Sequence, residues 1–103
     1  MSEEKSPPGR PAEGSRAGRD GPMRILVVDD EEIVRDSLRS WFEMEGYFVG
    51  VAPGGKEALA LLAEGHWDLF ILDVKMPGMD GLELQRRIRE AFPLAVIIIM
   101  TAY

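Results

Sequence analysis

The chain has 103 residues, no cysteine and a formal net charge of −6, with 46% hydrophobic and 29% charged residues. This composition is typical of one small globular domain. The acidic balance argues against direct binding to nucleic acid, and the lack of cysteine excludes a disulfide framework, a thiolate zinc site and a thiol nucleophile. The longest apolar run, 94–100, is too short to cross a membrane. With no secretory signal visible, we expect a cytoplasmic protein without membrane contact.

Residues 1–22 are predicted to form a disordered N-terminal tail. They contain four glycines, four prolines and equal numbers of acidic and basic residues, and after Met1 nothing larger than alanine could join a core. Such a segment cannot offset its ordering entropy by burial. We therefore place the folded domain at residues 23–103.

Within that domain, apolar segments typical of strands alternate with segments of helical periodicity. Strands are expected at 25–28, 47–51, 68–72 and 94–100, and helices at 31–45, 57–64 and 81–92. Asp30 and Asp80 are predicted N-caps, and Gly46 is predicted to end the first helix.

Each outer helix has one apolar stripe that should face the core. The first helix is expected to bury Val34, Leu38, Trp41 and Phe42, and the third to bury Leu84, Ile88, Ala91 and Phe92. Glu83 and Arg87 are spaced to form an ion pair on the solvent side of the third helix.

This alternation predicts an α/β fold with right-handed crossovers and a parallel sheet. In an open sheet of this kind, ligands bind at the carboxyl ends of the strands. Asp29 and Asp30 end the first strand, Asp73 ends the third, and Thr101 ends the fourth. We therefore expect these four side chains to converge on one edge.

Three carboxylates at one edge predict a cation site. Each close pair would repel by about 4 kcal/mol at an effective dielectric constant of about 20, and Lys75 is the one nearby cation expected from the sequence. A divalent ion such as Mg²⁺, bound by carboxylates, a carbonyl and water, would relieve this repulsion. An aspartate can also attack phosphorus to form an aspartyl-phosphate, and the Thr101 hydroxyl could bind the phosphoryl oxygens.

Structural interpretations compete with these assignments. The run 29–32 is also typical of a helix start, where the dipole favours acidic residues, and His66 is interpreted as a solvent-facing or packing residue. A phosphate loop at 53–56 is excluded because the required glycine–lysine spacing is missing.

Three segments resemble the receiver domain of response regulators in two-component signalling. They are ILVVDDE (25–31), DLFILDVKMPGMDG (68–81) and IIIMTAY (97–103). The last is most similar to receivers of nitrogen-regulation-type transcription activators. The resemblance implies a flavodoxin-like fold and a phosphorelay module that is not itself an enzyme.

The resemblance also implies residue roles and partners. Asp73 would be the phosphoacceptor, and a histidine kinase would donate the phosphoryl group in the presence of Mg²⁺. Asp30 would bind the metal directly and Asp29 largely through water, while the backbone carbonyl of Lys75 would be a third ligand. Thr101 would be the switch hydroxyl. Other receiver chains are a further candidate partner.

The match covers about two-thirds of a receiver, which in full continues into a fourth helix, a fifth strand and a fifth helix. The missing part carries a lysine that pairs with the phosphoryl group. In the family's strand order, its loss leaves 94–100 as an exposed apolar edge, which favours aggregation. The alternative function is therefore a truncated, non-phosphorylated fragment that acts only as a protein-binding module or is inert.

Overall fold

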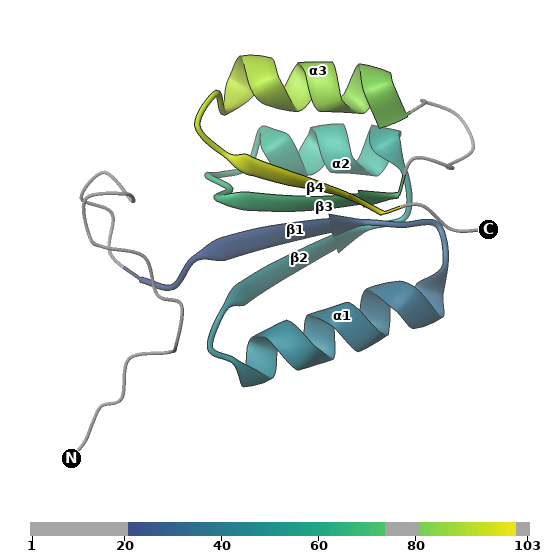
Figure 1. The fold of residues 1–103 in the computed structure, drawn as a ribbon, viewed down its shortest axis with the longest axis vertical. Helices are drawn as coiled ribbons and strands as arrows, with labels where there is room; N and C mark the ends of the chain where they lie inside the picture. Colours follow the sequence, from purple (N-terminus) through teal and green to yellow (C-terminus); the bar gives the residue numbers. More distant parts are fainter. Residues whose placement is uncertain (1–20, 74–80, 101–103) are drawn as a thin grey trace.

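The computed structural model describes residues 21–73 and 81–100, which form a sheet covered by helices on both faces (Figure 1). The strands are β1 (Arg24–Val28), β2 (Phe48–Ala52), β3 (Leu69–Asp73) and β4 (Val96–Met100). The helices are α1 (Glu32–Met44), α2 (Gly55–Leu62) and α3 (Gly81–Ala91). The predicted α/β alternation is thus confirmed. The proposed tail at 1–22 lies almost wholly outside the described residues and stays a prediction.

The sheet is parallel, with the strand order β2-β1-β3-β4. The central strands β1 and β3 pair with each other and carry the most deeply buried side chains. This order is the flavodoxin-like arrangement that the sequence predicts, and it puts β4 at one edge of the sheet formed by the described residues. Among these residues, no helix has the length and apolar character needed to span a membrane.

Two apolar clusters hold the layers together. The larger cluster lies between the sheet and the helices α2 and α3, and includes Phe70, Leu84 and Ile88. The smaller one lies between the sheet and α1 and includes Ile25 and Val27. Because β1 and β3 contribute to both clusters, they are packed on both faces. The residues at the carboxyl ends of these two strands are therefore held in place by a rigid core.

Two positions in the fold require glycine. Gly46 follows α1 with a φ of 95° and donates its amide to the carbonyl of Glu43 at 3.0 Å, which confirms the predicted helix end. Gly50 faces the buried indole of Trp67, where an added Cβ would lie 2.6 Å from Trp67 Cη2. The indole itself is anchored by a 3.0 Å hydrogen bond to the carbonyl of Leu61.

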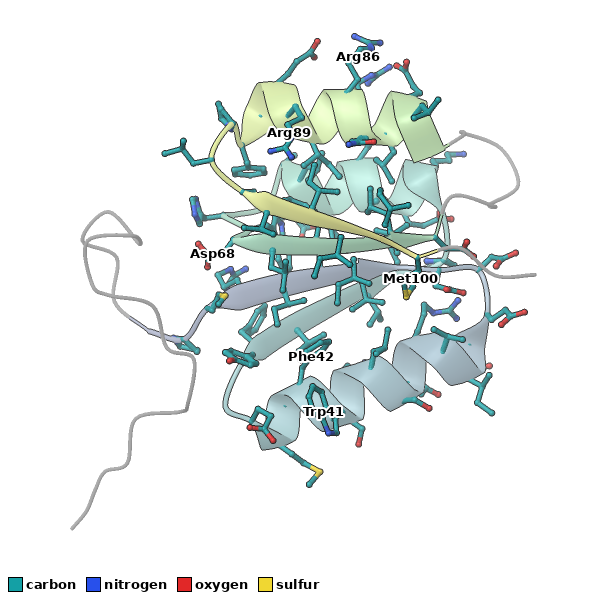
Figure 2. All side chains as sticks on the ribbon, viewed as in Figure 1. Trp41, Phe42, Asp68, Arg86, Arg89 and Met100 are labelled. Carbon is teal, nitrogen blue, oxygen red and sulfur yellow. The ribbon has the colours of Figure 1, made fainter. Side chains whose placement is uncertain are left out.

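The predicted burial of α1 is partly wrong. Phe42 reaches from α1 toward the sheet, whereas Trp41 stays on the surface of the helix (Figure 2) and is 57% exposed. Met44, near the end of the same helix, is 81% exposed. Among the described residues, α1 is the one helix on this face and it lies mainly against β1 and β2, so only the narrow stripe that includes Leu38 and Phe42 meets the sheet.

The predictions for α3 are mostly confirmed. Leu84 and Ile88 are buried, and Arg87 Nε lies 2.9 Å from Glu83 Oε2, the expected ion pair. Ala91, expected to be buried, is exposed because it lies at the last turn of the helix. The predicted cap Asp80 lies outside the described residues.

Candidate functional site

Three aspartates meet at the carboxyl edge of the sheet. Asp29 directly follows β1, Asp30 comes next, and Asp73 is the last residue of β3. Val28 is level with Leu72 in the β1–β3 register, so the residues after them reach the edge together. One carboxylate oxygen from each of the three aspartates lies within 4.8 Å of those from the other two. The structure therefore brings together the three carboxylates named from the sequence.

The exposure of the three side chains differs. Asp29 is 5% exposed and Asp73 is 6% exposed, whereas Asp30 is exposed. The cluster thus has a buried wall formed by the two strand ends and an open side at Asp30. A cation could enter from solvent and still contact carboxylates that water cannot fully hydrate.

Asp29 is fixed by three hydrogen bonds. Its amide donates to the carbonyl of Ala52 at 3.1 Å, and its Oδ1 accepts the amide of Glu31 at 2.8 Å. Its carbonyl accepts a 2.9 Å hydrogen bond from Arg35 Nη1. These contacts with described residues use the backbone and Oδ1 of Asp29 but not Oδ2, which is therefore available to a ligand.

The pKa of Asp29 is raised above its ordinary value. Burial is the largest cause, and it is reinforced by the negative charges of Asp73 and Asp30. The hydrogen bond from the Glu31 amide and the positive charge of Arg35 act in the opposite direction. Because the net effect disfavours the ionised carboxyl, a cation at this position would stabilise the site.

The donor set fits a hard divalent cation. Mg²⁺ binds oxygen ligands, commonly through one or two carboxylates together with water and a phosphate oxygen. The described site offers only carboxylate oxygens, two of the three groups are buried, and the third opens to solvent. The composition and shape of the site therefore agree with the magnesium site that the sequence predicts.

The predicted N-cap at Asp30 is wrong. Helix α1 begins one residue later, with Glu31 at the N-cap position and no side-chain cap hydrogen bond. It is Asp29 that accepts the amide of Glu31, because its carboxylate lies directly under the turn. The side chain of Asp30 is therefore not used by the helix.

Arg35 was missed, because Lys75 was expected to be the one cation near the cluster. The available signal is its position in the first turn of α1, since long helical side chains point back toward the N-terminus. Lys75 and Thr101 both lie outside the described residues. The register does pair Asp73 with Met100, the residue before Thr101.

His66 lies away from this site. Its hydrogen-bond partner Asp68 lies at the opposite end of the molecule from Met100 (Figure 2). Its Nε2 is 3.1 Å from Asp68 Oδ1, and its ring packs edge-on against Phe92 with centroids 5.4 Å apart. This agrees with the interpretation of His66 as a solvent-facing or packing residue.

Comparison with known proteins identifies the same kind of domain. A family model described as the response regulator receiver domain matches residues 25–103. The response regulator MprA of Mycolicibacterium vanbaalenii is 47% identical over 81 residues, which make up 79% of this chain and 35% of MprA. The chain thus spans about a third of the length of the curated relatives it matches.

Solved structures agree with the sequence comparison. The response regulator TrrA of Thermotoga maritima, in complex with Mg²⁺-BeF, superposes with a TM-score of 0.72 at 47% identity over 79% of this chain and 70% of TrrA. TrrA has also been solved in complex with the histidine kinase ThkA, with a TM-score of 0.71. A CheY-like receiver from Methanospirillum hungatei gives a TM-score of 0.77 at 35% identity, covering 81% of this chain and 66% of that one.

Proposed function

The chain belongs to the response regulator receiver domain family, and from this membership we propose that Asp73 accepts a phosphoryl group from a histidine kinase with the help of Mg²⁺. The observation that carries the proposal is the gathering of Asp29, Asp30 and Asp73 within 4.8 Å at the carboxyl edge of the sheet. The carboxyl edge is the edge at which open α/β sheets bind their ligands.

Asp30 and Asp73 would hold Mg²⁺ directly, with the backbone carbonyl of Lys75 as a third ligand and Asp29 acting largely through water. Bound Mg²⁺ would neutralise charge on the transferring phosphoryl group. The proposal draws support from the donor set, which is made of oxygen alone, and from the Mg²⁺-BeF complex of TrrA.

Asp73 is proposed as the nucleophile because it ends a central strand and is held from both sides of the sheet. A carboxylate oxygen of Asp73 would attack the phosphorus of a phosphohistidine, forming the O–P bond as the N–P bond breaks. The electron pair of the broken bond would remain on the histidine nitrogen. Thr101 would then donate its hydroxyl to a phosphoryl oxygen.

The partner is proposed by analogy with TrrA, which binds the histidine kinase ThkA. The open side of the site at Asp30 gives such a partner access to the cluster. The alternative is a non-phosphorylated binding module, which is favoured by the exposed apolar residues of β4, with Val96 57% and Ile98 46% exposed. The cytoplasmic location stays a prediction.

Thermal unfolding in the presence of Mg²⁺ and beryllofluoride tests this function. A ligand that binds only the folded state at a hundredfold excess over its Kd stabilises that state by about 2.7 kcal/mol. We expect Mg²⁺ to raise the midpoint and beryllofluoride, which mimics the phosphoryl group, to raise it further. Asp30→Ala should abolish the Mg²⁺ effect, and Asp73→Asn should abolish the beryllofluoride increment.

Asp36→Asn is the matched control, because it removes an exposed acid on α1 whose ion-pair partner is Arg39. This variant should keep both responses. A cooperative transition that ignores Mg²⁺ would contradict the proposal and favour the binding module. The absence of any transition would mean that the 103-residue chain does not assemble the site.

A further inference from the structure

We propose that Arg35 is a positioning residue of the acidic site, which fixes the turn between β1 and α1 and thereby the direction of Asp30. This inference rests on the proposed function, because it treats Asp30 as a metal ligand. Arg35 is not a member of the carboxylate cluster, which consists of Asp29, Asp30 and Asp73. Arg35 acts on the cluster through the backbone of Asp29, at the 2.9 Å hydrogen bond from its Nη1.

Arg35 binds the turn at two points. Its amide donates to the carbonyl of Glu31 at 3.1 Å as part of the helix start, and its guanidinium donates to the carbonyl of Asp29. These two carbonyls stand on either side of Asp30. The helix therefore holds both ends of the short segment that carries the exposed carboxylate.

The hydrogen bond from Arg35 to the Asp29 carbonyl is the contact that controls the direction of the Asp30 side chain. This carbonyl belongs to the planar peptide group that joins Asp29 to Asp30. Because the Cα of Asp30 lies in the same plane, a hydrogen bond that holds the carbonyl also holds the position of that Cα. On the other side, the amide of Glu31 is bound to Asp29 Oδ1 at 2.8 Å. With both flanking peptide groups bound, the Asp30 side chain has few directions left.

The hydrogen bond of Arg35 and its positive charge have opposite effects on the affinity of the site for Mg²⁺. A cation beside the cluster lowers its affinity for Mg²⁺ by repulsion, so loss of the charge alone would tighten binding. Loss of the hydrogen bond would free the turn and weaken binding, as removal of outer contacts to metal ligands commonly does by about ten- to a hundredfold. The hydrogen bond is made to a partly buried carbonyl, where an unpaired acceptor is costly. We therefore infer that position dominates.

The choice of arginine agrees with this role. A guanidinium presents its donors in a rigid plane and is less strongly hydrated than an ammonium group. Arg35 is only partly exposed, so its hydrogen bond is shielded from competing water. A lysine at the same position would keep the charge but hold the carbonyl less firmly.

Calorimetric titration of the full chain with MgCl₂ separates these effects. We expect Arg35→Met to weaken Mg²⁺ binding about tenfold, and Arg35→Lys to fall between this variant and the wild type. Arg39→Met is the matched control, because Arg39 is on the same helix, 45% exposed, and paired with Asp36 at 3.8 Å. It removes the same charge one turn further along and should leave the affinity within about twofold.

Amide hydrogen exchange in the metal-free protein provides a second readout. Exchange at Glu31 should be faster in Arg35→Met than in the wild type, and unchanged in Arg39→Met. Circular dichroism would establish that each variant is folded. This readout tests the hold on the turn without any metal, so it also applies if the wild type fails to bind Mg²⁺, a result that would contradict the proposed function itself.

Tighter Mg²⁺ binding by Arg35→Met would overturn the inference, because it would mean that charge outweighs position. Unchanged affinity together with unchanged exchange at Glu31 would also overturn it, since Arg35 would then be only one of several contacts of α1. Weaker binding with faster exchange, both confined to the Arg35 variants, is the result that supports it.

Discussion

At the residue scale, Asp29 combines a buried position with a negative charge that burial disfavours. It is 5% exposed and lies beside two other carboxylates, yet it uses its amide, its carbonyl and Oδ1 in structural hydrogen bonds. Its place in the fold is thus fixed by polar contacts while its charge is opposed by burial. Such conflicts are common where a site has to bind a charged ligand.

Asp29→Asn should stabilise the metal-free protein at neutral pH. The pKa of Asp29 is raised in the folded state above its ordinary value of 3.8, so the ionised form is less favourable folded than unfolded. This group therefore destabilises the fold fully above its folded-state pKa, and the penalty is relieved as the pH falls toward 3.8. Asparagine keeps an oxygen for the Glu31 amide and carries no charge.

Urea unfolding between pH 3.5 and pH 8 in the presence of a chelator would measure this effect. We expect the variant to gain stability over the wild type as the pH rises, while Asp36→Asn, an exposed substitution on α1, follows the wild-type profile. If Asp29→Asn were less stable than the wild type at pH 7, the carboxylate would have to be stabilised by its surroundings, and the account of its burial would be wrong.

At the scale of elements, β2 and β4 are the two edge strands of the described sheet, and β4 is the one in which no residue is fully buried. It pairs only with β3 among the described residues, and it alternates between two environments. Ile97 packs against the larger apolar cluster and Met100 against the smaller one. Val96 and Ile98 lie on the same side of the strand as Met100 but are 57% and 46% exposed, because α1 covers β1 and β2 instead.

Ile98→Lys should reduce self-association of the 103-residue chain. An exposed apolar edge strand is a template for pairing with another chain, and an outward lysine at the edge blocks that pairing. Sedimentation velocity over a range of concentrations would detect the change, with the wild type forming larger species and the variant remaining smaller. Because Ile98 is half exposed, we expect a stability change within about 1 kcal/mol.

Ile33→Lys provides the control for this experiment. Ile33 is 75% exposed on α1, so its replacement removes apolar surface and adds the same charge without touching the edge strand. It should leave self-association nearly unchanged. Equal effects of the two substitutions would mean that general charge, and not the β4 edge, controls association.

At the scale of the whole molecule, the sequence predicts the fold because its two periodicities are clear. Short apolar runs and helical stripes alternate without interruption, and a parallel sheet follows from the short connections. The acidic site follows from the same pattern, since Asp29 and Asp30 follow β1 and Asp73 ends β3. Their approach within 4.8 Å requires only that the two strands be neighbours.

The features that could not be predicted depend on side-chain reach and on what covers each face. An apolar stripe does not reveal how wide a contact the sheet offers, so Trp41 was expected to be buried. The capping residue depends on the path of the turn, which puts Asp29 and not Asp30 under the Glu31 amide. Arg35 contacts a backbone carbonyl six positions away, and its place in the first turn of the helix does not by itself specify which carbonyl the guanidinium reaches.

The most direct test of the central claim is transfer of a phosphoryl group to the purified chain, followed by intact mass spectrometry. Incubation with acetyl phosphate and Mg²⁺ should add one phosphoryl group that hydroxylamine removes, as expected for an acyl phosphate. The adduct should be lost with chelator and in Asp73→Asn, and kept in Asp36→Asn. A folded, Mg²⁺-binding protein that gains no adduct, or one that gains it equally in Asp73→Asn, would contradict the assignment of Asp73 as the phosphoacceptor.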